Sequence, residues 1–172
     1  MKLTVQLRVV GIYFNTPITF ESASPSIASL MYEASKQFPI DLPGGFAYTS
    51  TKSTDPSVVS ISHNFNGRFD YDGNGSTADS VDGLTLAGET LKAGIYELIE
   101  QSIASGLVGW QYYVIRGKDV VSTTPPSRGF QSYSKFILQD GDKVIWRLVG
   151  IAKTPVKRTS RYERIAGVQT RT

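Results

Sequence analysis

The chain has 172 residues and a net charge of +3, from 18 Lys and Arg against 15 Asp and Glu. Its hydrophobic content of 40% is enough to fill a core, which excludes a wholly disordered chain. The absence of Cys excludes disulfide scaffolds, thiol catalysis and thiolate metal sites, and a single His excludes multi-histidine centres. The length and composition indicate one β-rich domain.

No apolar run approaches the roughly 18 residues that a membrane-spanning helix needs, so we expect no membrane span. The first residues alternate apolar and polar side chains, whereas a secretory signal would carry a continuous apolar block. We therefore expect synthesis in the cytoplasm, which is compatible with later assembly into a virion or a surface complex.

The first 22 residues predict a β-hairpin. Apolar residues at every second position from Leu3 indicate a half-buried strand, and turn signals at Gly11 and 15–17 precede a second strand. Ser24 followed by Pro25 then predicts a helix over 24–38, with Ser24 as its N-cap. Its apolar positions recur at helical spacing, namely Ile27, Leu30, Met31, Ala34 and Phe38.

The rest of the chain predicts strands and loops. Residues 57–61 indicate a strand, and 63–83 indicate a long surface loop or an irregular hairpin. Residues 91–103 fit either a helix or a strand, and the strand is favoured because Gly94 would weaken a helix by about 1 kcal/mol. The remaining predictions are a strand at 110–115, a loop at 124–127, and strands at 136–138 and 144–148 around a tight turn at 140–142.

Two short sequences carry a family resemblance. Gly109-Trp110-Gln111-Tyr112-Tyr113-Val114 and Gly141-Asp142-Lys143-Val144-Ile145-Trp146 resemble motifs of the transcobalamin-C-terminal-like β-grasp domains. With the hairpin, the helix and 58–61, the likeness covers discontinuous pieces of the chain, and 62–108 would be an insert. We expect the aromatic side chains of both motifs to pack in the core, because aromatic residues in strands usually do so.

The expected fold is therefore α+β. A β-grasp-like mixed sheet packs on one helix at 24–38 and carries a β-rich insert at about 62–108. We expect a single domain over 1–152, followed by a basic C-terminal tail over 153–172. In cobalamin carriers the family's domain helps to cover the corrinoid, but no residue here maps onto that role.

One segment resembles a calcium loop. Oxygen-bearing residues occupy its alternate positions, namely Asp70, Asp72, Asn74 and Ser76. Val81 stands where such a loop places a bidentate Glu, and Asp-Gly and Asn-Gly are also ordinary turn sequences. We expect no calcium binding tighter than about millimolar, and expect the acidic insert to bind basic side chains instead.

His63 is the one candidate proton shuttle near neutral pH. The sequence has no nucleophile elbow, phosphate-binding loop or zinc motif to accompany it. We therefore predict that His63 lies in a surface loop and that the protein is not an enzyme and holds no cofactor.

Charge is unevenly distributed. Residues 70–100 hold seven acidic side chains against Lys92, whereas 153–172 hold six cations against Glu163 and carry a net charge of +5. The expected partner-binding residues are these six cations, Lys153, Lys157, Arg158, Arg161, Arg164 and Arg171.

These features favour a non-enzymatic structural or interaction protein, a subunit of a larger assembly such as a virion or a surface complex. Its expected partners are copies of itself or other protein subunits. The basic tail is also compatible with binding to nucleic acid. The alternative is a small-molecule or calcium-binding β-grasp module.

Overall fold

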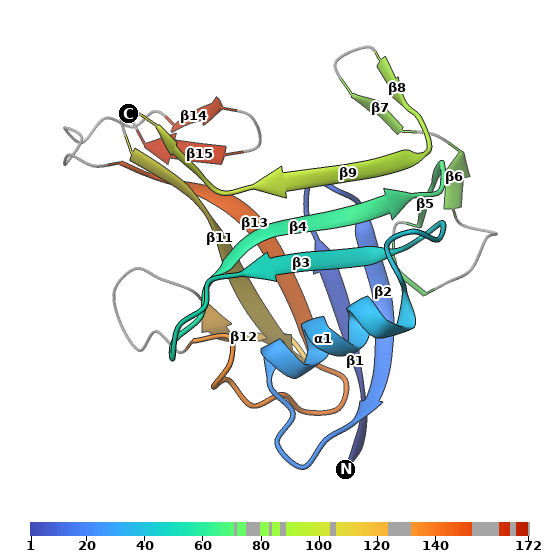
Figure 1. Cartoon of the computed structure of the whole chain (residues 1–172), viewed down its shortest axis with the longest axis vertical. Coiled ribbons are helices and arrows are strands. Elements are labelled where there is room, and N and C mark those ends of the chain that lie inside the picture. Colours follow the sequence, from blue (N-terminus) through green and yellow to red (C-terminus); the bar gives the residue numbers. More distant parts are fainter. Residues whose placement is uncertain are drawn as a thin grey trace.

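The computed structural model describes residues 1–70, 72–74, 80–82, 84–86, 89–103, 106–123, 132–152, 162–165 and 168–171. These residues form a β-rich α+β structure with one helix, α1 (Ile27–Gln37) (Figure 1). The strands are β1 (Lys2–Val9), β2 (Phe14–Glu21), β3 (Phe46–Ser50), β4 (Val58–Phe65), β5 (Arg68–Asp70), β6 (Ser80–Asp82), β7 (Leu84–Leu86), β8 (Glu89–Leu91), β9 (Gly94–Ile99), β10 (Gln101–Ile103), β11 (Gly106–Arg116), β12 (Asp119–Thr123), β13 (Lys143–Ala152), β14 (Tyr162–Ile165) and β15 (Val168–Arg171).

The main sheet has the order β10-β11-β13-β1-β2, and β12 pairs with β11. Strands β1 and β2 form the predicted N-terminal hairpin, with Lys2 opposite Glu21 and Val9 opposite Phe14. β13 pairs with β11 in the antiparallel sense and with β1 in the parallel sense. The sheet is therefore mixed, and it joins the two ends of the sequence through β1 and β13.

A second layer covers one face of the main sheet. It consists of α1 and the antiparallel sheet β3-β4-β9, whose strands run across those of the main sheet (Figure 1). The alternating apolar residues of β1 and β2 point into the space between the layers and meet the apolar stripe of α1 and β4. Burial of this apolar surface stabilises the two-layer arrangement, because it removes the surface from water.

The helix begins two residues later than the sequence suggests. Its N-cap is Ser26 rather than Ser24, because Ser26 Oγ accepts from the Ser29 backbone N–H and Ser29 Oγ accepts from the Ser26 N–H. Pro25 lies outside the helix, where its carbonyl accepts a hydrogen bond from the Leu138 N–H (2.7 Å). This long-range bond ties Pro25 to the segment before β13, outside the helix.

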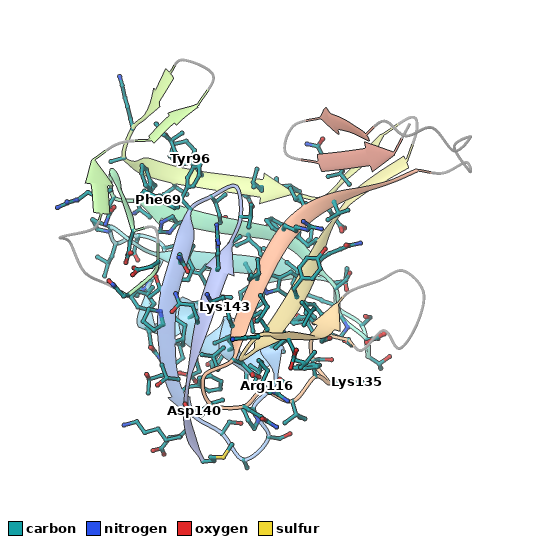
Figure 2. The ribbon with its side chains drawn as sticks, turned by 180° about the vertical axis from the view of Figure 1, so that it is seen from behind. Phe69, Tyr96, Arg116, Lys135, Asp140 and Lys143 are labelled. Atoms are coloured by element: carbon teal, nitrogen blue, oxygen red, sulfur yellow. The ribbon has the colours of Figure 1, made fainter. Side chains whose placement is uncertain are left out.

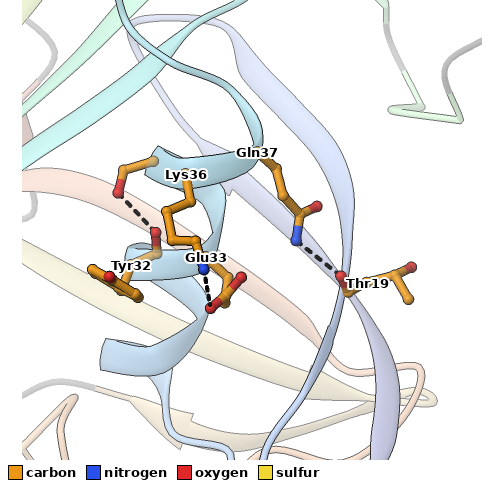
Figure 3. Close-up of polar contacts among 6 residues, drawn as sticks. Thr19, Tyr32, Glu33, Lys36 and Gln37 are labelled. Atoms are coloured by element: carbon orange, nitrogen blue, oxygen red, sulfur yellow. Dashed lines mark hydrogen bonds and ion pairs between the residues drawn. The ribbon is translucent and has the colours of Figure 1, made fainter.

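Polar contacts also tie the helix to the sheet (Figure 3). Gln37 Nε2 donates to the Thr19 carbonyl of edge strand β2 (2.9 Å), and Lys36 pairs with Glu33 on the exposed side. The buried stripe Ile27, Leu30, Met31 and Ala34 is the predicted one, whereas Phe38 is the C-cap and packs against the core from its margin.

Of the hairpin predicted around 140–142, the turn and the strand at 144–148 are confirmed, whereas the strand at 136–138 is wrong. Residues 136–138 form no strand, and Ile137 makes only an isolated bridge to Ser26. The turn instead docks on β1, because Gly141 N–H donates to the Thr4 carbonyl (2.9 Å) and Thr4 N–H donates to Asp140 Oδ1 (2.7 Å). It therefore delivers β13 to the parallel position beside β1.

The structure also tests most of the remaining strand and loop predictions. The strand interpretation of 91–103 is confirmed by β9 and β10, and that of 110–115 by β11. β4 is longer than predicted and includes residues 63–65, so the predicted loop begins later. The predicted loop at 124–127 lies outside the described residues. Within the described part of the chain, no helix is long and apolar enough to cross a membrane.

Candidate interaction face

The second face of the main sheet is not covered by α1 or by β3-β4-β9. Strand alternation places the polar residues of β1 on this side, since Leu3, Val5 and their successors point inward. Figure 2 looks onto this side, with the helix behind the sheet. In the part of the chain that the structure describes, the two-layer fold therefore leaves this sheet face open, and its residues come from strands far apart in the sequence.

Three cations gather on the middle of this open side. Arg8 on β1 lies opposite Ile145 on β13, while Lys143 and Arg147 flank Ile145 at alternate positions of the same strand. All three cations are exposed, and none forms an ion pair with another residue that the structure describes. We call Arg8, Lys143, Ile145, Arg147 and the neighbouring Tyr113 the basic face.

Apolar and aromatic surface lies between these cations. Tyr113 on β11 is the cross-strand neighbour of Ile145, and the Arg147 guanidinium lies over its ring, 4.6 Å from the centroid. Arg147 Nη2 also donates to the Tyr113 hydroxyl. The contact orients a cation without neutralising it, so the basic face offers both positive charge and apolar contact.

The segment that resembles a calcium loop docks beside the basic face through Gly73. Gln6 Nε2 on β1 donates to the Gly73 carbonyl (3.2 Å) and to Asn15 Oδ1 on β2 (2.8 Å). Gly73 has a φ of +70°, and a Cβ at this position would lie 2.2 Å from Gln6 Nε2 and 2.6 Å from Asn15. Glycine therefore allows the loop to contact the sheet directly.

The candidate calcium ligands are only partly brought together. Asp70 Oδ1 accepts from the Gly73 N–H (2.9 Å), and Asp72 accepts from the backbone and side-chain N–H groups of Asn74. These bonds use the carboxylates as turn-stabilising acceptors. Ser76 lies outside the described residues, so weak calcium binding stays a prediction.

A partly buried ion pair supports the end of the basic face. Asp142 is fully buried, and its two carboxylate oxygens accept hydrogen bonds from Arg116 Nε and Nη2, each 2.8 Å long. It also accepts from the Gln139 backbone N–H (2.8 Å). Because Asp142 immediately precedes Lys143, this pair holds the start of β13 in place and so positions the basic face.

The predicted surface position of His63 is wrong. His63 lies on β4, is 7% exposed, and its Nδ1 lies 2.8 Å from the Gly45 carbonyl. A carbonyl oxygen only accepts, so Nδ1 carries the proton. Burial lowers the pKa of the imidazole, and the bond to Gly45 opposes this shift. The side chain is part of the aromatic core.

The motif aromatic residues pack largely as expected. Tyr112 and Trp146 are buried, with ring centroids 5.4 Å apart, and Tyr133 meets Trp146 edge-on at 5.8 Å. Trp110 is half-buried and packs against the same core. The buried indole N–H groups of Trp110 and Trp146 have no acceptor among the described residues.

The structure describes only two of the six cations that are predicted to bind a partner through the C-terminal tail. Arg164 lies on β14 and Arg171 on β15, which pair with each other, and β15 also contacts β13. The other four predicted contact residues, Lys153, Lys157, Arg158 and Arg161, lie outside the described residues.

Sequence reasoning missed the basic face, although part of its signal is visible. Lys143, Ile145 and Arg147 alternate with buried residues along one strand, which places them on one side of any sheet. Their meeting with Arg8 depends on the parallel pairing of β1 and β13, and no local pattern specifies that pairing.

Comparisons with known proteins leave the chain without a family assignment. No protein-family model matches it, and no curated protein sequence matches it either. The basic face therefore has to be judged by its own chemistry.

Proposed function

We propose that this protein is a non-enzymatic interaction protein, a subunit of a larger assembly, that binds an acidic partner on its basic face. The main support for this proposal is that Arg8, Lys143 and Arg147 share one open sheet face and form no ion pair with an acidic residue among the described residues. An uncompensated group of cations attracts acidic surfaces and accelerates their association. Ile145 and Tyr113 add apolar contact to this attraction.

The proposed fold is that of a β-grasp-like domain, as the resemblance implies. Its support is the strand order β2-β1-β13-β11, in which the N-terminal and C-terminal strands pair in parallel at the centre. A helix follows the first hairpin and packs on the resulting sheet. We propose that a protein with this fold is a subunit of an assembly of the kind found in a virion or a surface complex.

The non-enzymatic part of the proposal rests on His63. Its ring is enclosed by core aromatic residues and its Nδ1 proton is bonded to a backbone carbonyl. A general base must reach the proton that it abstracts, and this imidazole is shielded from an external substrate. The six cations of the tail would add to the positive field that attracts the partner.

Binding of an acidic polymer tests the proposal. Poly-L-glutamate is titrated into the full chain at low salt by calorimetry, and we expect binding that weakens as salt is added. Lys143→Glu/Arg147→Glu should weaken this binding by about tenfold or more, and the tail cations account for any binding that remains. Lys36→Glu/Lys52→Glu makes the same change in net charge outside the basic face and should retain it. Equal losses in both variants, or no binding by the unmodified chain, would contradict the proposal.

A second candidate function is small-molecule binding. The observation that favours it is the pair of buried indole N–H groups without acceptors among the described residues, at diagonal positions of β11 and β13, where Trp110 lies opposite Leu148 and Trp146 opposite Tyr112. A buried unsatisfied donor costs about 1–3 kcal/mol, which a ligand oxygen could recover. Because the resemblance is to corrinoid-covering domains, cyanocobalamin is the probe, and saturable calorimetric binding that is lost in Trp110→Phe/Trp146→Phe would support this candidate.

A further inference from the structure

Strand β9 presents a second surface of complementary chemistry. Ile95, Glu97 and Ile99 point outward from the β3-β4-β9 sheet, while the intervening Tyr96 and Leu98 pack against the core. Ile95 is 59% exposed and Ile99 is 46% exposed. We call Ile95, Glu97 and Ile99 the β9 stripe, an acidic side chain between two exposed apolar ones.

The β9 stripe and the basic face lie on opposite sides of the molecule. β9 belongs to the layer seen in front in Figure 1, and the basic face belongs to the side seen in Figure 2. Each layer buries its inner residues against the other, so both surfaces point outward. They cannot meet within one copy of the chain.

The two surfaces match in both pattern and spacing. On β13 the outward order is Lys143, Ile145, Arg147, a cation on each side of an apolar residue. On the β9 stripe the charged and apolar positions are exchanged, with an apolar residue on each side of the acidic Glu97. Both stripes cover four residue steps, about 13 Å of strand.

We propose that the basic face of one copy binds the β9 stripe of a second copy. This inference rests on the proposed function and names its acidic partner. Glu97 would lie over Ile145, between Lys143 and Arg147, in a position to contact both cations. Ile95 and Ile99 would cover the aliphatic stems of these two side chains, which bury carbon while keeping their charge in water.

Such a contact is head-to-tail. Different surfaces meet at each interface, so a pair of bound copies leaves one basic face and one β9 stripe unoccupied. Repetition of the contact extends a chain of subunits, which closes into a ring only if the rotation between copies permits it. The same two surfaces therefore provide a route to a large assembly.

Charge reversal on each surface tests the contact. Sedimentation velocity of the full chain at low salt should show association that increases with concentration. Glu97→Lys and Lys143→Glu/Arg147→Glu should each weaken this association by about tenfold or more, because like charges then meet. An equal mixture of the two variants should associate again, since each surface then meets one of opposite charge. Circular dichroism and thermal unfolding verify that both variants fold.

The outcomes separate this inference from the proposed function. Failure of the unmodified chain to associate, or failure of the mixture to recover association, would overturn the head-to-tail contact. If poly-L-glutamate still binds and this binding still needs Lys143 and Arg147, the proposed function stands with a different acidic partner. The Lys36→Glu/Lys52→Glu control should associate like the unmodified chain, and a loss there would also overturn the inference.

Discussion

The imidazole of His63 lies near Phe14 and Phe65 in the core, with ring centroids 5.3 and 6.4 Å away. Its pKa is lowered because burial penalises the charged ring. The folded protein therefore holds a neutral imidazole at a pH where the unfolded chain already binds a proton. The difference makes stability depend on pH, through the one histidine in the sequence.

We expect the free energy of unfolding to fall as the pH drops from about 7.5 to about 5.5. The unfolded chain gains its proton near the ordinary His pKa of about 6.5, whereas the folded chain gains one only at lower pH. His63→Asn keeps a donor for the Gly45 carbonyl but does not titrate. Urea unfolding should show a smaller pH dependence in this variant, and an unchanged dependence would contradict the assignment.

Gly73 is a second residue whose role depends on a contact with residues far away in the sequence, Gln6 and Asn15. Its positive φ disfavours other residues, and a Cβ there would also collide with Gln6 and Asn15. Gly117 has a similar φ of +61° but open space around its Cβ position. Comparison of the two glycines separates backbone strain from loss of the loop contact.

Gly117→Ala should cost about 1–2 kcal/mol of stability, the ordinary cost of left-handed backbone with a Cβ. Gly73→Ala should cost more, because the loop must also leave β1. Chemical denaturation of both variants measures the difference. Equal costs would mean that the loop contact contributes nothing to stability.

At the scale of elements, helix α1 is positioned by contacts on both sides of its first turn. The capping box between Ser26 and Ser29 satisfies backbone N–H groups of both residues, and the bridge from Ser26 to Ile137 accompanies the extended backbone of Ser26 itself. Local preference allows either Ser24 or Ser26 to cap the helix, and the bridge selects Ser26.

Ser26→Ala should therefore destabilise the protein by about 1 kcal/mol, the usual cost of losing an N-cap. Ser24→Ala should have almost no effect, because the Ser24 side chain is exposed and outside the helix. Thermal or urea unfolding of the two variants distinguishes the positions, and a larger cost at Ser24 would favour the cap that the sequence suggested.

At the scale of the whole molecule, folding and assembly involve different parts of the chain. Every residue of the described core cluster lies within 1–152. The open surfaces lie on either side of that core, and the strongly basic segment 153–172 follows it. A change in the tail should therefore alter association more than folding.

Removal of residues 153–172 should leave a folded domain that associates more weakly. The deletion removes six cations and the β14–β15 hairpin but no residue of the described core cluster. Light scattering measures the assembly, and circular dichroism measures the fold. Association that is unchanged in extent and in salt dependence would contradict a role for the tail.

The sequence by itself determined the features that depend on short-range pattern. Alternation from Leu3 predicts the N-terminal hairpin, and helical spacing predicts the buried stripe of α1, because each pattern places apolar side chains on one face of a local element. The strand at 110–115 follows from its aromatic and β-branched residues, and the strand interpretation of 91–103 follows from the cost of Gly94 in a helix.

Only the tertiary structure decided which elements meet. Asp140 and Gly141 form a tight-turn sequence, yet their hydrogen bonds to Thr4 direct the next strand to the parallel position beside β1. His63 stands in a polar sequence, yet pairing with β3 and β9 carries it into the core. Such pairings join residues far apart in the chain, so no local pattern specifies them, and they alone bring Arg8 beside Lys143 and Arg147.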